Sequence, residues 1–542
     1  MADDGKTRSG TGSSGRIRDD RPLLFLLLGI ALFHVVTMPA FFYPGDNFAP
    51  RAAAVNLLTT GDIGIEPSAR PELESFLRQK GQYFFERDGT GRLYSKYGIG
   101  NTLLCLPPLL ADRLTGGDLV YQSEAGSLLI WLNLWSIVLT LLATVFIYRI
   151  VSLYTDRSLI RIGFILVLWY TTFAWYYLRA PGLEIYQVVP FLGFIFHLLA
   201  SLRAREGEAP GTPTAEADPR FGAHLLRAAL WLGVLVLVKL FFIILIPVVW
   251  IFALGAGGKS DTFGERLRRN LSEAGIRALI RPLVIPTIAI VIAVLLVNQL
   301  KFGSPFTSGY GQWLGADGQS HDRFAFSWIG PAISSFLFRP GNANIFIHAP
   351  SLLVALFGLP AFLRRNRSEA LFLLAVIVVI FLGVIPFSSW AGEWCYGPRY
   401  LLPIVLIGTL PRIEVGEWLL RAPRRIAAPI AITVGAVLLW SFSMQVRINS
   451  LHYFTFHRTQ AFFAPFQNPD ISAYYGGLVH RGILHRDLIR SREGRREFPP
   501  AATLRELAPP ERRGEIERAL LPVLHEAVRP NYLLFVRPGR ID

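Results

Sequence analysis

Several stretches of this chain are long, apolar and almost free of charge, and they constrain its fold more than any other feature. Residues 22–42, 164–178 and 371–384 are three of them. About 20 such residues in a helix cross the ~30 Å hydrocarbon core of a bilayer. Charged residues make up 17% and hydrophobic residues 52% of the 542, which is less charge than a soluble globular protein of this length carries. The sequence therefore predicts an all-α polytopic membrane protein.

Basic residues predict the topology, because positive charge gathers in cytoplasmic loops. The formal net charge of +15 is explained in this way, so we expect no nucleic-acid partner. We expect about eleven transmembrane helices, with the N-terminus inside and the C-terminus outside. The predicted parts are a disordered cytoplasmic tail at 1–21, a transmembrane domain at 22–445 with its first extracytoplasmic loop at 43–122, and a small extracytoplasmic C-terminal domain at 446–542.

Two segments near the N-terminus allow a second interpretation. Residues 1–40 could form a signal peptide, but the apolar run is long for one and no clear small-residue cleavage site follows it, so we expect an uncleaved first helix. Residues 99–110 of the first loop are apolar but too short to span a membrane. They contain Pro107 and Pro108, and we expect an interfacial helix there.

The apolar stretch 225–254 decides on which side of the membrane the later loops lie. Its 30 residues would extend ~45 Å as one helix, which is long for one crossing and short for two. The next segment, 255–281, carries six basic residues and should be cytoplasmic. A hairpin of two short helices that turns near Lys239 places it there. One straight helix would move it, and the loops after it, to the other side.

Two acids stand at the outer ends of predicted helices. Asp46 follows the first helix and Glu184 precedes the fourth. Either acid could simply favour a helix N-terminus, with Asp46 as the N-cap of a helix at 52–58. The functional interpretation is a general base at the lipid–water boundary, where partial desolvation tunes a carboxylate. The two acids could also face one another and bind a metal ion or position an acceptor.

Two lysines lie near the same boundary. Lys96 and its neighbour Tyr97 precede the interfacial stretch, and Lys96 is a candidate partner for a phosphate. Lys239 is the one cation within its apolar stretch, and a charge at that depth is a functional candidate. Snorkelling to the headgroups is the alternative for both lysines.

Two later outer loops supply further candidates. The loop after the seventh helix is rich in Gly and Pro, which suits a shaped loop, and it contains Tyr310 and Arg339. The loop after the ninth helix contains Glu393 and Arg399 among Trp and Tyr residues of the kind that forms interfacial belts. Because Arg399 comes directly before an apolar helix, an anionic lipid phosphate is a natural partner for its guanidinium.

In their order along the chain these motifs resemble the glycosyltransferase C superfamily, specifically its bacterial branch related to protein O-mannosyltransferases and lipid A aminoarabinose transferases. The resemblance extends over residues 22–445. The matching runs are Gly-Asp at 45–46, Thr-Gly-Asp-Ile at 60–63, Tyr-Ser-Lys-Tyr-Gly at 94–98, Leu-Pro-Pro-Leu at 106–109, the segment 179–184, Phe-Gly-Ser-Pro at 302–305, Ser-Gly-Tyr at 308–310 and Tyr-Gly-Pro-Arg-Tyr-Leu-Leu-Pro at 396–403.

Proteins of this superfamily transfer a sugar from a polyprenyl-phosphate carrier to an acceptor on the outer face of the membrane, here the bacterial cytoplasmic (inner) membrane. The resemblance implies that Asp46 is the base that deprotonates the acceptor hydroxyl and that Glu184 matches the acid of the second loop. It also implies that cations hold the donor phosphate. The candidate substrate-binding residues are Lys96, Tyr97, Lys239, Tyr310, Arg339, Glu393 and Arg399.

The implied partners are the polyprenyl-phosphate sugar, a lipid, glycan or protein acceptor, and membrane lipids. No cofactor follows with certainty. Relatives often carry paired acids in the first loop, whereas here Asp46 is followed by Asn47. The departure puts a simple carry-over of metal dependence in doubt, and a divalent metal stays open.

Two other function classes fit part of the sequence. A lipid-linked glycan flippase or transporter predicts polar residues near mid-membrane in several helices, preferably with internal repeats. An O-antigen polymerase or ligase uses the same class of donor, and Arg323 and Arg339 in an outer loop leave it open. Because the unusual polar residues lie in the predicted outer loops, an enzyme is favoured over a transporter.

Overall fold

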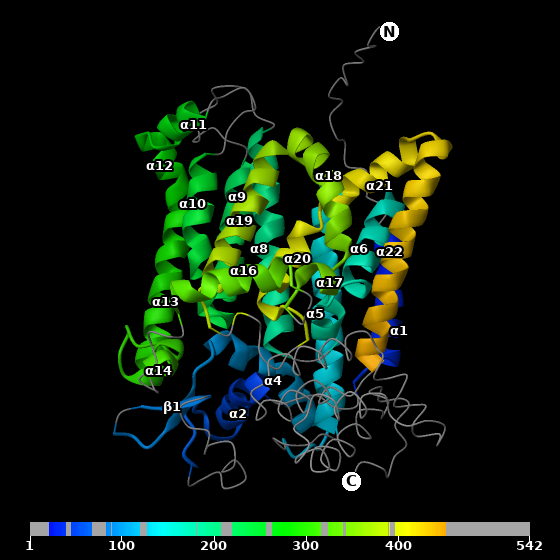
Figure 1. The fold of residues 1–542 in the computed structure, drawn as a ribbon. Helices are drawn as coiled ribbons and strands as arrows, with labels where there is room; N and C mark the ends of the chain where they lie inside the picture. The colour runs from blue at the N-terminus through cyan, green and yellow to red at the C-terminus, as the bar shows by residue number, and fades with distance from the viewer. Residues whose placement is uncertain are drawn as a thin grey trace, which may run out of the picture.

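The described part of the chain is almost entirely helical. The computed structural model describes residues 21–39, 45–67, 83–87, 89–119, 127–179, 182–206, 219–255, 263–315, 324–339, 343–388, 390 and 396–450. Two short strands, β1 (Phe84–Glu86) and β2 (Leu93–Ser95), pair antiparallel. Figure 1 shows the long helices side by side as a bundle, with α2 (Gly45–Thr60), α4 (Ile99–Leu114) and β1 gathered at one end. We call this end the loop end.

Six helical segments in the described residues are long and apolar enough to cross a membrane, by length and composition. They lie in α5 (Ser127–Ser152), α8 (Leu183–Glu206), α9 (Pro219–Val238), α12 (Glu273–Leu279) continued by η5 (Ile280–Val284) and α13 (Ile285–Phe302), α19 (Arg367–Val384) and α22 (Arg424–Ser450). Shorter apolar helices are α1 (Arg21–Val36), α6 (Ser158–Tyr170), η4 (Leu240–Leu245) with α10 (Ile246–Leu254), and η6 (Phe326–Trp328) with α16 (Ile329–Leu337). The expected number of eleven spans stays a prediction, as does the side on which each end lies.

The remaining described helices connect these segments. They are α7 (Ala174–Leu178), α11 (Phe263–Asn270), α14 (Gly309–Gly315), α17 (Ile345–His348), α18 (Ser351–Arg365), η7 (Arg399–Leu401), α20 (Leu402–Gly408) and α21 (Arg412–Arg421).

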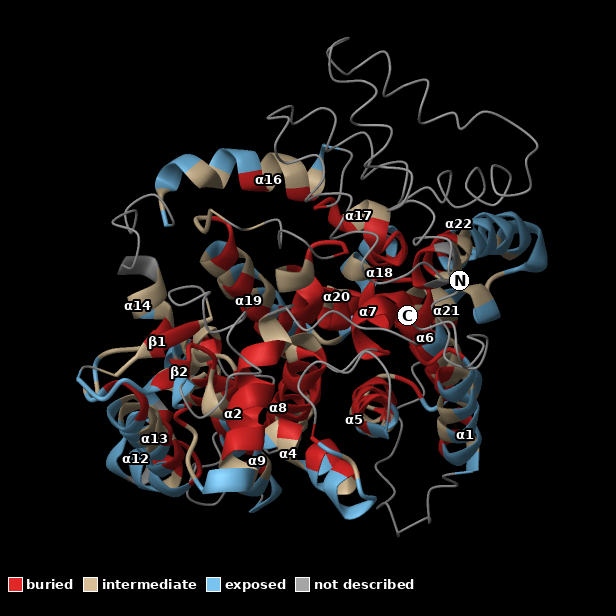
Figure 2. Cartoon of the chain, turned by 90° about the horizontal axis from the view of Figure 1, so that it is seen from below, coloured by how far each residue is buried: buried red, intermediate tan, exposed pale blue. Residues whose placement is uncertain are grey.

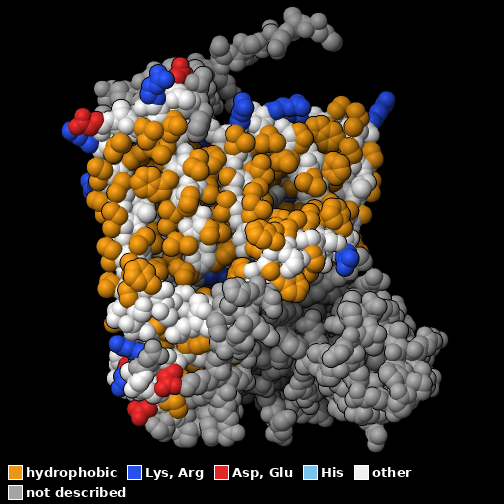
Figure 3. Space-filling view, turned by 60° about the vertical axis from the view of Figure 1, so that its left-hand side comes forward, with side chains coloured by type: hydrophobic (Ala, Val, Ile, Leu, Met, Phe, Trp, Pro, Cys, Tyr) orange, Lys and Arg blue, Asp and Glu red, His pale blue; other side chains and the backbone are white. Residues whose placement is uncertain are grey.

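The outer surface of the bundle is apolar. Figure 3 shows hydrophobic side chains over the flank of the helices, with Lys and Arg gathered mainly at the two ends of the bundle. Large hydrophobic side chains are exposed on it, among them Phe25 and Leu32 of α1, Ile432 and Leu439 of α22 and Phe357 of α18. So much exposed apolar surface marks contact with lipid. The chain is therefore a multi-pass helical membrane protein, as predicted.

The stretch 225–254 forms the predicted hairpin. Helix α9 ends at Val238, Lys239 has an extended backbone (φ −146°, ψ 105°), and η4 begins at Leu240. η4 packs against α9, and Figure 1 shows α11, which follows α10, at the end away from the loop end. The chain therefore turns at Lys239 and returns, and the turn lies near α4.

Close backbone contact fixes the tip of this hairpin to the start of α4. Asn101 donates a hydrogen bond of 2.6 Å from Nδ2 to the Val238 carbonyl and is 2% exposed. A Cβ atom placed on Gly98 would lie 2.1 Å from the Leu237 carbonyl oxygen, and one on Gly100 would lie 2.8 Å from the Val238 nitrogen. Both glycines are needed because no side chain fits between the two backbones.

We expect Gly98→Ala to destabilise the protein by about 1–3 kcal/mol, since the new methyl group forces the hairpin away from α4. Thermal unfolding of the purified protein in detergent measures the loss. Gly29→Ala on α1 is the matched control, because no atom lies within 4 Å of a Cβ there. Equal unfolding temperatures for the two variants would show that the hairpin tip does not depend on this contact.

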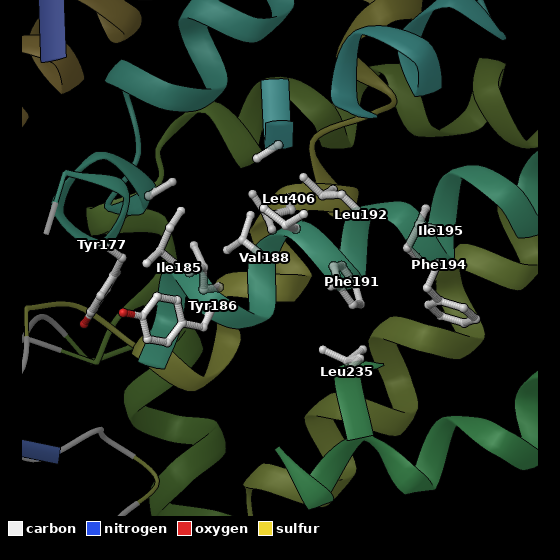
Figure 4. Close-up of a cluster of buried hydrophobic side chains, with 14 of the residues drawn as sticks. Tyr177, Ile185, Tyr186, Val188, Phe191, Leu192, Phe194, Ile195, Leu235 and Leu406 are labelled. Atoms are coloured by element: carbon white, nitrogen blue, oxygen red, sulfur yellow. The ribbon is translucent and has the colours of Figure 1, made fainter. Parts of the chain in front are cut away.

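Helix α8 forms the centre of the bundle. It packs chiefly against α9 and α5, and it is buried on nearly every side. Figure 4 shows Phe191, Leu192 and Ile195 of α8 among other buried side chains, with Leu235 of α9 and Leu406 of α20 nearby. A helix that is apolar on all sides belongs in the interior. Its first turn, which carries Glu184, is thereby held in a fixed place.

Some helix boundaries differ from those predicted. The first helix ends at Val36 and not near 42, because Pro39 lacks an N–H and restricts the residue before it. The predicted span at 159–178 is broken between α6 and α7, where the Thr171 and Thr172 hydroxyls donate to the Val167 and Leu168 carbonyls. Such bonds compete with the helix ladder.

The structure describes only some of the other segments discussed from the sequence. The apolar stretch 99–110 belongs to a longer helix, α4, whose buried face packs on α2, α5 and α9. Cys105 of α4 is buried, while Cys395 lies outside the described residues. The predicted tail at 1–21, except Arg21, and the C-terminal domain beyond Ser450 also lie outside them.

Candidate functional site

Asp46 is held at the loop end by two long-range hydrogen bonds. It lies in the first turn of α2. The Tyr97 hydroxyl donates to Asp46 Oδ1 over 2.6 Å, and Arg399 Nη1 donates to Asp46 Oδ2 over 2.9 Å. The expected helix through 52–58 is part of α2, but α2 begins at Gly45, so Asp46 is an acid in its first turn and not its N-cap. Both of its carboxylate oxygens instead bond to residues far away in the sequence.

Glu184 meets the same guanidinium. Arg399 Nη1 lies 3.6 Å from Glu184 Oε1, and the side chains of Arg399 and Glu184 are 11% and 13% exposed. The Asp46 side chain is 30% exposed. One guanidinium nitrogen therefore bridges two carboxylates that come from the first turns of α2 and α8. In Figure 2, which views the molecule from the loop end, α2 and α8 lie beside each other near its middle.

Asn47 fixes the distance between these two helices. Its Oδ1 accepts a hydrogen bond of 2.7 Å from the Leu183 backbone N–H at the start of α8. The approach is close, because a Cβ atom on Gly182 would lie 3.1 Å from Asn47 Nδ2. The first turn of a helix has N–H groups without intrahelical partners. Asn47 satisfies one of them from α2, and so holds Asp46 and Glu184 near each other.

Lys239 and Tyr400 complete this side of the cluster. Lys239 Nζ lies 4.8 Å from the centre of the Tyr400 ring, which is a cation–π contact. It is also near enough to Glu184, Arg399 and Asp46 to interact with all three electrostatically. Arg399 Nη2 donates to the Tyr400 hydroxyl over 3.0 Å. The hairpin turn thus places its cation within electrostatic reach of the two acids.

Aromatic rings surround Lys96 on the other side. Its Nζ lies 4.5 Å from the Trp313 ring centre, 5.2 Å from that of Tyr97 and 5.5 Å from that of Tyr83. Tyr310 packs edge-on against Tyr97, with ring centres 6.1 Å apart. These contacts leave Lys96 8% exposed and close enough to Asp46 to affect it electrostatically.

The charges of the cluster set the ionisation of Asp46. Burial alone would raise the pKa of Asp46, but Arg399 and then Lys96, with hydrogen bonds from Tyr97 and Arg399, hold this pKa below its ordinary value of 3.8. Burial and the neighbouring Asp46 raise the pKa of Tyr97 well above 10.0. At neutral pH the carboxylate is therefore charged, and the phenol keeps the proton that it donates.

Tyr97→Phe removes one of the bonds that stabilise the Asp46 carboxylate, so the pKa of Asp46 should rise. For a carboxyl group with a lowered pKa, the charged form is lost as the pH falls through that pKa. We therefore expect the acid limb of any pH–kcat profile that depends on Asp46 to move to higher pH in Tyr97→Phe. Tyr83→Phe, which alters a ring beside Lys96, is the matched control. An unmoved acid limb in Tyr97→Phe would contradict the assigned contact.

Most of the residues selected from the sequence lie together. We use the name Asp46 cluster for Asp46, Lys96, Tyr97, Glu184, Lys239, Tyr310, Arg399 and Tyr400. Arg339 is not joined to it by any contact among the described residues. It is exposed, its backbone N–H bonds to Ser334, and its carbonyl accepts from Asn344. Glu393 and Arg323 lie outside the described residues. The chemical role of each candidate stays a prediction.

Three residues of the site were not selected from the sequence. Asn47 was noted only as a departure from paired acids, and Tyr400 only as an interfacial aromatic residue. Lys301, at the end of α13, is 4% exposed and donates from Nζ to the Tyr97 carbonyl over 2.7 Å. Lys301 could have been noticed in the sequence, since it ends an apolar helix directly before the Phe-Gly-Ser-Pro motif. Its hydrogen bond to the Tyr97 carbonyl could not have been predicted from the sequence.

Comparisons with known proteins give partial likenesses of fold. No family model and no curated protein match the chain. The archaeal oligosaccharyltransferase AglB from Archaeoglobus fulgidus, in complex with an inhibitory peptide and a dolichol-phosphate, is 12% identical with a TM-score of 0.47, covering 83% of this chain and 59% of its own. ArnT from Cupriavidus metallidurans, bound to undecaprenyl phosphate, is 12% identical with a TM-score of 0.44, covering 90% of this chain and 80% of its own.

A second AglB structure, tethered to an acceptor peptide with the NVT sequon, is 13% identical with a TM-score of 0.45, and it covers 85% of this chain. This chain spans 59% of the length of either AglB chain.

Proposed function

We propose that this protein transfers a sugar from a polyprenyl-phosphate donor to an acceptor at the outer face of the membrane. The observation that carries the proposal is the Asp46 cluster itself, in which a charged carboxylate lies against Arg399, with Lys96 and Lys239 close by. Cations of this kind bind a phosphate. A carboxylate beside them can take a proton from an acceptor. The assignment to the outer face rests on the topology predicted from the basic loops, and the assignment to bacteria rests on the motif resemblance.

The reaction is an inverting displacement at the anomeric carbon. The acceptor oxygen forms a bond to that carbon while the bond from carbon to phosphate oxygen breaks. The acceptor proton passes to Asp46, and the electron pair leaves with the polyprenyl phosphate. Arg399 and Lys96 stabilise the charge that grows on this phosphate, which is the kind of stabilisation that contributes most to many enzymes. Glu184 and Tyr97 hold Arg399 and Asp46 in place for it.

The position of the cluster suits a lipid-linked donor. It lies where α2, α4 and the hairpin tip meet the ends of the apolar helices. A polyprenyl chain could stay in the bilayer while its phosphate reaches Arg399 and Lys96. A transporter would instead need polar groups along a path through the membrane. The gathering of these charges at one end of the bundle supports the enzyme.

A donor panel tests the proposal. Purified full-length protein in nanodiscs is mixed with labelled polyprenyl-phosphate sugars of different sugar and chain length, together with a bacterial envelope extract as the acceptor source. We expect label to move from the donor to an acceptor with at least one donor. Movement of an intact labelled lipid across the bilayer of proteoliposomes, without transfer from any donor, would overturn the enzyme proposal in favour of a flippase.

A further inference from the structure

One nitrogen of the Arg399 guanidinium lies close to both acids of the cluster. Arg399 Nη1 is 2.9 Å from Asp46 Oδ2 and 3.6 Å from Glu184 Oε1. A shared position between two carboxylates, each offering an oxygen, is also where a divalent cation would bind. We propose, on the basis of the function proposed above, that the Arg399 guanidinium takes the place of a divalent metal ion between Asp46 and Glu184, so that transfer needs no metal.

The donor atoms around the acids do not suit a metal ion. Ca²⁺ takes six to eight oxygen ligands and Mg²⁺ demands near-ideal octahedral geometry. Asp46 Oδ1 accepts from Tyr97, and its Oδ2 accepts from Arg399. Each Asp46 oxygen therefore already has a partner, and Arg399 Nη1 lies within 4 Å of both Asp46 Oδ2 and Glu184 Oε1. Among the described residues, no group of three or more His, Cys, Asp and Glu side chains could hold a metal ion.

The residue after Asp46 does not supply a further ligand. Asn47 Oδ1 accepts from the Leu183 backbone N–H over 2.7 Å. That bond joins α2 to α8 and keeps the amide oxygen directed at the start of α8. An acid at this position would have added a charge beside Asp46, whereas the neutral amide adds none. Where relatives often carry a second acid, this chain thus has an asparagine whose side chain joins α2 to α8.

The charge balance also disfavours a dication. Two acids, Asp46 and Glu184, lie with three cations, Arg399, Lys96 and Lys239. The cluster therefore carries one excess positive charge before any donor arrives. An anionic phosphate lowers the electrostatic energy of such a cluster, while a divalent cation raises it. A guanidinium also offers several N–H donors in one plane, so Arg399 can hold both carboxylates and still reach a phosphate oxygen.

A binding measurement on the purified full-length protein tests this directly. Mn²⁺ is titrated into the wild type and into Asp46→Asn and Glu184→Gln while free Mn²⁺ is followed by electron paramagnetic resonance. We expect the three proteins to bind equally little Mn²⁺. Binding by the wild type at one site per chain, lost in both variants, would overturn the proposal. This readout needs no sugar transfer, so it stands even if the proposed function fails.

A charge-deletion pair tests the role of Arg399 itself. Arg399→Gln leaves two carboxylates near each other without their shared partner, and we expect its unfolding temperature to fall. Adding Glu184→Gln should recover more than half of that fall, because one of the repelling charges is gone. A double variant less stable than Arg399→Gln would overturn the bridging role. Arg365→Gln, which breaks the pair of Arg365 with Glu414, should not be rescued by Glu184→Gln.

Once a donor is known, the transfer assay tests whether sugar transfer depends on a metal ion. With Arg399 in place of a metal ion, we expect the rate of transfer to change less than twofold in excess EDTA and in added Mn²⁺ or Mg²⁺. A loss of more than tenfold in EDTA, restored by one of these ions, would overturn the proposal while leaving the proposed glycosyl transfer standing.

Discussion

Asp46→Asn is expected to lower kcat for sugar transfer by about 100- to 10,000-fold, the range over which a positioned general base acts. The amide keeps the size of the side chain and can still accept from Tyr97, but it cannot take the acceptor proton. Binding of the donor should survive, because its phosphate is held by Arg399 and Lys96. Initial rates at saturating donor, together with the donor concentration at half-maximal rate, separate the two effects.

Asp156→Asn is the matched control for this variant. Asp156 lies between α5 and α6, is almost fully exposed and pairs with Arg161, so the change alters an aspartate–arginine pair outside the cluster. We expect it to keep the wild-type rate. Undiminished transfer by Asp46→Asn would remove the base from the mechanism, even if the protein is a glycosyltransferase.

Arg399→Gln is expected to lower kcat/KM by about 100- to 1,000-fold, as the loss of one preorganised charge-stabilising group does. Two causes act together. The leaving phosphate loses its cation, and Asp46 loses the guanidinium that holds its pKa below 3.8. Removing this partner raises the pKa of Asp46, so the deficit should grow as the pH falls. A pH series of kcat/KM for wild type and variant measures both effects.

Two further variants sharpen this second prediction. Arg399→Lys keeps the charge but lacks the planar fork of N–H donors that a guanidinium presents, so its activity should fall between that of the wild type and that of Arg399→Gln. Arg92→Gln, which breaks a surface pair with Asp62, should leave the rate unchanged. If Arg399→Lys were as inactive as Arg399→Gln at every pH, charge would not explain the effect.

Much of the bundle could be predicted because hydrophobic runs and basic loops follow simple rules. The hairpin at 225–254 shows this well. Length alone left one helix or two open, and the basic segment after it required a turn, which the structure has at Lys239. That turn carries a lysine to the acids of α2 and α8. The gathering of Asp46, Glu184 and Arg399 also followed from their place at the same ends of predicted helices.

The contacts within the site could not be predicted in the same way. Tyr97 and Asp46 are 51 residues apart, and Arg399 and Asp46 are 353 apart, so no local pattern links them. Lys301 reaches the Tyr97 carbonyl only because α13 packs beside the first loop. Asparagine often caps the helix that it begins. Asn47 instead bonds to the first turn of α8, at Leu183, 136 residues further along the chain. Packing between helices decides such pairs, and spacing along the chain does not record it.

The competition of two lipids for the purified protein tests the central claim most directly. Undecaprenyl phosphate and undecaprenol share a tail and differ in the phosphate, so native mass spectrometry of an equal mixture measures what the cluster adds. The account predicts at least a tenfold preference for the phosphate in the wild type and a loss of that preference in Arg399→Gln. A preference that is absent in the wild type, or unchanged in Arg399→Gln, would contradict a phosphate site built on Arg399.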